Sequence, residues 1–238
     1  MPTLLTLNVK GGRAPLLRPL TAFLRSLDLD VLCLQECDRS TVRWLQERLA
    51  GDWQASWAPA AYCGNAVLSR HPLRSARLLS LQVPHSETRS AVDAVIDLPG
   101  GLLRVCCTHL DHVAEPIRLA QWAVLSAGTA AVGGGLLCGD LNALCRSDYT
   151  DAAWEDIAAV RSDGGWEPPQ HVLLDALLAG GFTDAVGEPP EPTSRFETRI
   201  DYVLAAADCP WRPVERTTLP VLALGLSDHN GVQVRLVR

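Results

Sequence analysis

The first fifth of the chain alternates between unbroken apolar runs and segments whose apolar residues recur every three or four positions. Residues 3–9 and 31–36 are apolar runs that end in polar residues, which is typical of buried strands. Residues 16–27 place leucines and a phenylalanine at helical spacing, and residues 42–49 repeat that pattern. The order predicted here is therefore strand, helix, strand, helix.

The middle of the chain predicts strands in succession instead. These are expected at residues 53–57, 66–69, 78–83, 91–98 and 102–109. Turn signals such as His71-Pro72 and Pro99-Gly100-Gly101 separate them.

The last 120 residues return to a mixed pattern. A helix is predicted over residues 117–131, a buried strand over 136–138, and closing strands over 200–204 and 232–236. Residues 146–192 are rich in Trp, Pro, Asp and Gly, and one helix is expected there, at 172–178. Long strands with helices at both ends and in the middle predict an α/β (α+β) fold. We expect a four-layer αββα sandwich, with two packed mixed β-sheets flanked by helices, in a single domain of residues 1–238.

Composition narrows the class of protein. The 238 residues are 47% hydrophobic, enough for one sizeable core, and no apolar run approaches the roughly 18 residues that cross a bilayer. The amino terminus has the pattern of a strand and not of a secretion signal. A soluble, intracellular protein, cytoplasmic or nuclear, is expected, and a monomer is assumed. The eight cysteines lie mostly in apolar runs without a Cys-x-x-Cys pair, which favours buried reduced thiols.

Charge is distributed unevenly. The net charge is −6, yet residues 1–89 hold 11 Lys and Arg against 7 Asp and Glu, whereas residues 90–238 hold 10 against 20. A protein that grips long nucleic acid without sequence preference carries a clear basic excess, because phosphate neutralisation supplies most of that affinity. Any contact with a polyanion must therefore be local.

Polar residues of chemical interest follow or precede the predicted strands at five places. They are Asn8, Glu36, His109, the pair Asp140 and Asn142, and the pair Asp228 and His229. Asp201 lies inside the apolar segment Arg199-Ile200-Asp201-Tyr202-Val203-Leu204. Because the ends of neighbouring strands converge, these side chains are expected to meet at one sheet edge.

Each residue also has a structural interpretation. Asn8 before two glycines is a turn former by default, Glu36 suits a helix N-terminus, and His109 is compatible with a hydrogen-bonded core histidine. Residues 227–230 suit a turn. Asp201 is different, because a carboxylate in an apolar strand needs a partner to be buried.

The combination favours chemistry. Carboxylate and carboxamide oxygens are the ligands that Mg²⁺ and Mn²⁺ prefer, and two histidines supply proton transfer or hydrogen bonds to phosphate. Together these groups are what metal-assisted hydrolysis of a phosphodiester requires.

Six short motifs then carry a resemblance over nearly the whole chain. In order they are Leu7-Asn8-Val9, Leu34-Gln35-Glu36, Thr108-His109-Leu110, Gly139-Asp140-Leu141-Asn142, Arg199-Ile200-Asp201-Tyr202 and Ser227-Asp228-His229-Asn230. This series resembles the signature of the endonuclease/exonuclease/phosphatase superfamily, the deoxyribonuclease I-like fold. Residues 64–73 and the arginine at position 89 are also similar to that family.

The resemblance implies a role for each residue. Glu36 would be the main ligand of Mg²⁺ or Mn²⁺, completed by Asp228, with Asn8 beside it as a further ligand or positioning group. Asp140 would orient and deprotonate the attacking water. Asn142 would bind the nucleophile or a phosphate oxygen.

The histidines complete that set of implied roles. His229 would contact the phosphate and stabilise the transition state, held in orientation by Asp201. His109 would donate to a phosphate oxygen from the opposite side, and Arg89 would support that position and contribute to substrate binding.

The substrate is less determined than the chemistry. The motif Thr108-His109-Leu110 resembles the branches that contain deoxyribonuclease I, sphingomyelinases, inositol-polyphosphate phosphatases, deadenylases and tyrosyl-DNA phosphodiesterases. The apurinic-site endonuclease branch typically has a tyrosine-containing motif instead. That branch is disfavoured, because no tyrosine lies between Cys63 and Asn142. A phosphate ester that is a nucleic acid or nucleotide-like is the expected partner, as for a nuclease or DNA-adduct phosphodiesterase. A phospholipid or inositol-phosphate hydrolase, or a catalytically silent member that binds a phosphorylated ligand or a protein, is the alternative.

Overall fold

Two six-stranded sheets form the centre of the protein. The computed structural model describes residues 1–10, 14–129, 133–185 and 191–238. The first sheet has the order β11-β12-β1-β2-β4-β3. Its strands are β1 (Thr3–Asn8), β2 (Val31–Cys37), β3 (Gln54–Ala58), β4 (Gly64–Ser69), β11 (Arg212–Leu219) and β12 (Gly231–Val237). β1 runs parallel to β2 and antiparallel to β12, so the sheet is mixed.

The second sheet has the order β5-β6-β7-β8-β10-β9. Its strands are β5 (Leu73–Leu81), β6 (Arg89–Leu98), β7 (Gly101–His109), β8 (Gly135–Asp140), β9 (Thr183–Asp184) and β10 (Asp201–Ala205). Only the β7–β8 pair is parallel among these neighbours. This sheet is therefore mixed as well, as the sequence predicts.

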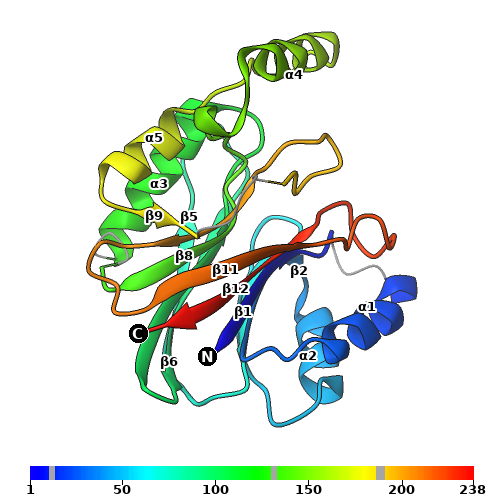
Figure 1. Ribbon diagram of the computed structural model, residues 1–238, viewed down its shortest axis with the longest axis vertical. Coiled ribbons are helices and arrows are strands. Elements are labelled where there is room, and N and C mark those ends of the chain that lie inside the picture. The colour runs from blue at the N-terminus through cyan, green and yellow to red at the C-terminus, as the bar shows by residue number, and fades with distance from the viewer. Residues whose placement is uncertain (11–13, 130–132, 186–190) are drawn as a thin grey trace.

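Helices cover the outer side of each sheet, as Figure 1 shows. They are α1 (Ala14–Ser26) and α2 (Arg39–Arg48) beside the first sheet, and α3 (Glu115–Thr129) and α5 (Val172–Ala179) beside the second. A short 3₁₀ turn, η1 (Arg146–Asp148), precedes α4 (Asp151–Asp163), which projects from the top of the molecule in Figure 1. The predicted α/β sandwich of two sheets flanked by helices is confirmed.

The alternation of side chains along each strand builds these layers. Leu4 and Cys33 point into the core between the sheets, where they join Val105 and Cys138 of the second sheet. Leu5 and its neighbours on alternate positions instead pack under α1 and α2. A strand whose two faces are both covered is apolar throughout, which explains the unbroken runs in the sequence.

Four elements were not predicted, namely η1, α4, β9 and β11, and one strand was placed wrongly. β5 begins at Leu73, so the predicted strand at residues 78–83 starts too late and ends too late. β11 is an edge strand with exposed and half-buried polar residues and an internal Pro213. Because it contains no apolar run, the sequence pattern did not predict it. The end of the predicted helix at residues 117–131 lies outside the described residues from position 130.

The omission of α4 has a clear cause. None of its residues is buried, so it lacks the apolar stripe by which helices are recognised. The available signal was its cap: the hydroxyl of Thr150 accepts a hydrogen bond from the backbone N–H of Ala153 at 3.2 Å.

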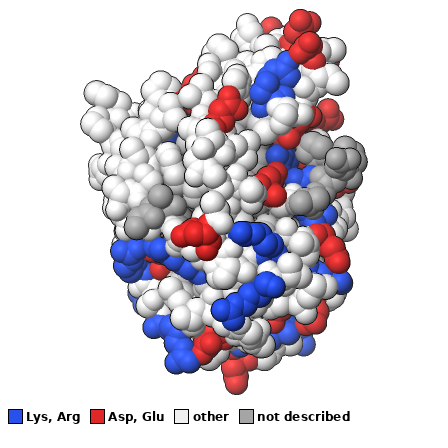
Figure 2. Space-filling view, turned by 60° about the vertical axis from the view of Figure 1, so that its left-hand side comes forward, with Lys and Arg blue, Asp and Glu red and all other residues white. Residues whose placement is uncertain are grey.

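All eight cysteines are free thiols, and seven of them are buried, which agrees with their expected role as small apolar residues. Among the described residues, no helix is long and apolar enough to cross a membrane. Figure 2 shows basic and acidic side chains interspersed and separated by uncharged surface on the described part of one face. No extended basic track crosses this view, in agreement with the charge argument from the sequence.

Candidate active site

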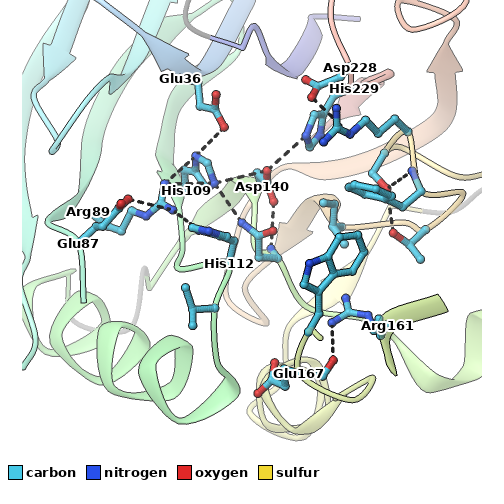
Figure 3. Close-up of a pocket in the computed structure, with 18 of the residues that line it drawn as sticks. Glu36, Glu87, Arg89, His109, His112, Asp140, Arg161, Glu167, Asp228 and His229 are labelled. Carbon is cyan, nitrogen blue, oxygen red and sulfur yellow. Dashed lines mark hydrogen bonds and ion pairs between the residues drawn. The ribbon is translucent and has the colours of Figure 1, made fainter. Parts of the chain in front are cut away.

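The polar ends of strands from both sheets meet in one cleft. Asn8 pairs in register with Gln35 at the end of the parallel strands β1 and β2, and His109 pairs with Asp140 at the end of β7 and β8. Asp201 at the start of β10 is the antiparallel partner of Asp140. The cleft has a volume of about 910 Å³. Figure 3 shows Glu36, His109, Asp140, Asp228 and His229 pointing toward one another there.

Asp140 lies at the floor of the cleft and is held through both of its oxygens. Oδ2 accepts a hydrogen bond from Nδ2 of Asn8 at 3.1 Å, and Oδ1 accepts one from the backbone N–H of Asn142 at 3.0 Å. Burial and the neighbouring charge of Asp201 raise the pKa of Asp140 to about 7. A carboxyl group with this pKa can both take up and release a proton near neutral pH.

Gly139 makes the position of Asp140 possible. Its φ is +136°, and a Cβ at this residue would lie 1.9 Å from the carbonyl oxygen of Thr108 on the neighbouring strand β7. Only glycine tolerates both the backbone conformation and this close approach. The glycine therefore lets β8 run against β7 up to the residue that carries the carboxylate.

Glu36 enters the cleft through an irregularity in β2. The register between β2 and β4 shifts between Leu34 and Cys37, and Glu36 has a φ of 51°, a conformation that non-glycine residues rarely adopt. Glu36 does not serve as a helix N-terminal carboxylate, since Asp38 caps α2 by accepting from the N–H of Thr41 at 2.6 Å. The bulge thus directs the charged side chain of Glu36 into the cleft.

Asn8 joins the two carboxylates. Its Nδ2 donates to Oε1 of Glu36 at 3.2 Å as well as to Asp140, while its Oδ1 accepts from the backbone N–H of Lys10 at 3.0 Å. The amide nitrogen and not the oxygen therefore faces the cleft. In this orientation the amide nitrogen of Asn8 positions Glu36 and Asp140.

His229 and Asp201 lie beside Asp140 in the cleft. Its Nδ1 lies 2.9 Å from Oδ2 of Asp201, and its Nε2 lies 3.8 Å from Oδ2 of Asp140. Burial by itself would lower the pKa of His229, but the charge and hydrogen bond of Asp201, followed by the charge of Asp140, raise it to about 10. His229 is thus an imidazolium at neutral pH, and Asp201 has the buried partner that the sequence required.

Thr193, which the sequence analysis did not mention, and Ser227, to which it gave no role, hold this pair in place. The hydroxyl of Thr193 accepts from the backbone N–H groups of Ile200 and Asp201, at 3.0 and 3.1 Å. Ser227 donates its hydroxyl to the carbonyl of Asn8 at 2.6 Å and accepts from the N–H of His229. The bond from Ser227 to Asn8 joins residues 219 positions apart, so the sequence gives no signal for it.

His109 is in the opposite electrostatic state from His229. Burial and the charges of Arg89 and His229 lower its pKa well below 6.5, so the ring is neutral. Nδ2 of Asn142 donates to Nε2 of His109 at 3.0 Å, which assigns the proton of the neutral ring to Nδ1. Nη1 of Arg89 lies 3.3 Å from both ring nitrogens, and Nη2 lies 3.1 Å from Nδ1 of His112.

The carboxylates in the cleft include a set suited to a divalent cation. Asp140, Asp201 and His229 each have one potential ligand atom within 4.8 Å of the others, but the protonated His229 has no lone pair left for a metal. Glu36 and Asp228 are different, because their oxygens face the open cleft and require compensation of charge. Nζ of Lys10 lies 2.7 Å from Oδ2 of Asp228, so a cation already neutralises one of them. Glu36 and Asp228 both line the cleft, and Asn8 orders the first of them.

The segment between β8 and β10 contributes the outer part of the cleft. Tyr149 and Trp154 pack against each other with ring centroids 5.9 Å apart. The hydroxyl of Tyr149 also accepts from the backbone N–H of Arg199 at 2.9 Å. Trp166 differs, since it is 48% exposed and lines the cleft.

Comparison with known proteins agrees with the geometry. The sequence profile of the "Endonuclease/Exonuclease/phosphatase family" matches residues 5–229, from β1 to His229. The chain belongs to this family. Its resemblance in six motifs, noted in the sequence, is thereby confirmed at the level of the family. Hydrolysis of phosphate esters is the general activity that this membership supports.

Among relatives by sequence, the "Uncharacterized protein YbhP" of Escherichia coli (strain K12) is 28% identical over 166 residues, which cover 58% of this chain and 65% of that protein. The match thus spans just under two thirds of the relative's length. Two solved structures share the endonuclease/exonuclease/phosphatase fold. The mannosyl-6-phosphatase Bt3783 of Bacteroides thetaiotaomicron VPI-5482 is 14% identical with a TM-score of 0.73, and covers 100% of both chains. A humanized D. rerio TDP2 is 18% identical with a TM-score of 0.71, and covers 100% of this chain and 99% of that one.

Proposed function

We propose that the protein is a phosphoric ester hydrolase that depends on Mg²⁺ or Mn²⁺ and attacks its substrate with an activated water. The observation that carries the proposal is the position of Asp140. This carboxyl group with a pKa of about 7 is fixed between Asn8 and Asn142 and faces a protonated His229. A base beside a cationic donor, with further carboxylates for a metal, meets the needs of attack on a phosphate anion.

In the proposed reaction, each residue at the floor of the cleft has one role. Asp140 accepts the proton of the attacking water, and Asn142 orients that water or a phosphate oxygen. His229 donates from Nε2 to a phosphate oxygen as negative charge develops, because Asp201 keeps Nδ1 engaged and the ring protonated.

His109 and Arg89 serve the other side of the phosphate. His109 presents an N–H from Nδ1, since Asn142 occupies its Nε2, and Arg89 holds the ring and adds positive charge. Glu36 and Asp228 would hold the divalent ion, which supplies charge neutralisation of the phosphate when bound. The substrate is a nucleotide-like phosphate ester or nucleic acid end, as for a nuclease or DNA-adduct phosphodiesterase. The free thiols support an intracellular location.

The test is a substrate panel with metal and variant controls. Single-stranded and duplex DNA, RNA, a 5′-tyrosyl oligonucleotide, phosphoinositides and sphingomyelin are incubated with Mg²⁺, with Mn²⁺ and with a chelator. Wild-type protein is expected to hydrolyse at least one nucleotide-like member only when metal is present. Asp140→Asn is expected to lower kcat about 10³-fold or more.

Asp52→Asn is the matched control, because Asp52 is exposed and takes no part in the cleft. Full activity of Asp140→Asn, or equal activity with the chelator, would contradict the mechanism. Hydrolysis confined to phosphoinositides or sphingomyelin would replace the nucleotide-like substrate by a lipid one.

A further inference from the structure

The cleft continues beyond the catalytic residues over an apolar wall. This wall consists of Ile157 and Val160 on α4, Trp166 in the loop that follows, and Phe196, all of which line the cleft. Val160, Trp166 and Phe196 are 55%, 48% and 46% exposed. Exposed apolar side chains gathered on a concave surface are typical of a ligand site.

Trp166 is held in a defined position on this wall. Its backbone N–H donates to the carbonyl of Arg161 at 2.8 Å, and its indole lies over Gly164, where a Cβ would come within 2.9 Å of the ring. Phe196 meets the indole edge-to-face, with ring centroids 5.0 Å apart and an interplanar angle of 71°. The two rings thus form a corner that presents aromatic surface to the cleft.

Buried ion pairs anchor the segment that carries Trp166. Arg118 of α3 is 2% exposed, and its guanidinium pairs with Glu115 at 2.7 Å and with Glu167, the residue next to Trp166. Figure 3 shows Glu167 and Arg161 across the cleft from Glu36. Because the base of the segment is fixed to α3, the wall keeps its place even though α4 buries none of its own residues.

The charges of the cleft argue against a chain of phosphates along this wall. Its described lining contains seven acidic residues and three arginines. Each arginine already has a partner: Arg89 contacts His109 and His112, Arg161 donates to the carbonyl of Glu167, and Arg195 lies 4.0 Å from Asp228 and over the ring of Phe196. A single phosphate can be neutralised at the catalytic floor, whereas further phosphates would meet carboxylates.

We propose that the Trp166–Phe196 corner binds a planar aromatic group, such as one nucleobase, that is ester-linked to the reacting phosphate. The inference rests on the proposed function and narrows its substrate to a small ester with one phosphate in the site. A planar group can lie against exposed aromatic rings that are already ordered, so that binding buries apolar surface without a rearrangement of the wall.

The experiment compares phosphodiesters that differ only in shape. Methyl naphthylmethyl phosphate and methyl decahydronaphthylmethyl phosphate have the same carbon skeleton, planar in the first and non-planar in the second. Hydrolysis is followed by ³¹P NMR with Mg²⁺ or Mn²⁺. The KM of the planar ester is expected to be about tenfold lower or more. Trp166→Ala is expected to bring the ratio of the two KM values close to one, and Trp166→Phe to retain most of it.

Gly164→Ala is a second, independent variant. Gly164 has an ordinary helical φ of −78°, so alanine fits its backbone, and the three atoms nearest to the added methyl group all belong to the indole of Trp166. This variant is expected to reduce the KM ratio severalfold while its melting temperature stays near that of the wild type. Equal KM values for the two esters in the wild type, a preference for the non-planar ester, or a ratio that survives Trp166→Ala would overturn the proposal.

A binding measurement separates the subsite from the reaction. The protein is labelled with 5-fluorotryptophan, and the ¹⁹F resonance of Trp166 is assigned by its absence from Trp166→Phe. Addition of the planar ester without metal is expected to shift this resonance more than the non-planar ester does. If neither ester is hydrolysed but the shift occurs, the proposed function fails and the subsite stands. If hydrolysis occurs without any selective shift or KM difference, only the subsite fails.

Discussion

Replacement of Asp201 by Asn tests how this protein keeps His229 protonated. Oδ2 of Asp201 lies 2.9 Å from Nδ1 of His229, and its charge is the largest influence that raises the pKa of the ring against the effect of burial. The pKa of about 10 lies about 3.5 pH units above the ordinary value of 6.5, equivalent to a preference for the imidazolium on the order of 5 kcal/mol. In Asp201→Asn the burial remains and the nearest charge is lost, so the pKa of His229 is expected to fall by about 2 pH units or more.

The assay is a pH titration of metal-free protein that carries ¹⁵N-labelled histidine, followed by NMR of the ring nitrogens. The chain has six histidines, so His229→Gln identifies the resonance. Asp228→Asn is the matched control, because Asp228 is the weakest of the charges that raise this pKa and its removal is expected to lower it by less than about 1 pH unit. A pKa in Asp201→Asn within about 0.5 pH units of the wild type would refute the reasoning.

Three further predictions concern stability. His229 has a pKa raised from 6.5 to about 10 in the folded state, so its contribution is complete below pH 6.5 and is lost as pH rises. The free energy of unfolding of metal-free protein, measured with urea, is expected to fall by up to about 3 kcal/mol between pH 6.5 and 9, and a flat profile would contradict this. Gly139→Ala is expected to cost about 2 kcal/mol or more in the same measurement, because its Cβ meets the Thr108 carbonyl at 1.9 Å. Gly134→Ala, also at positive φ but with nothing within 4 Å, should cost about 1 kcal/mol, and equal losses would exclude the steric cause. Thr193→Val leaves two backbone N–H groups without their acceptor and should cost about 2–4 kcal/mol by thermal or urea unfolding, whereas Thr193→Ser should recover most of the loss.

The strands and helices that bury apolar side chains were predictable from the sequence, since burial on one or both faces leaves a periodic pattern. β1, β2, β7 and β8 are mainly apolar up to the residues at which they reach the cleft. The elements that bury little, α4 and β11, left no such pattern and were missed. Their positions depend on contacts that are remote in sequence, such as the pairing of β11 with β12 and the ion pairs around Arg118.

Some properties of the candidate site were also predictable from the sequence, and others were not. The order and types of its polar residues are properties of the sequence, and they were sufficient to indicate metal-assisted phosphate chemistry and the family. The protonation states were decided only by the fold. His109 and His229 are the same residue type at the ends of apolar strands, yet one is buried beside Arg89 and the other beside Asp201.

The same holds for the metal ligands and for the substrate. The sequence left Asn8 as a ligand or a positioning group, and the structure adds that its amide nitrogen contacts Glu36 while its amide oxygen accepts from the N–H of Lys10. The aromatic corner of Trp166 and Phe196 joins residues that lie 30 positions apart and have no common motif. The sequence shows which side chains are buried, because a helix or strand with a buried face carries apolar residues at regular spacing. Charge states and binding surfaces depend on distances between residues that only tertiary packing brings together.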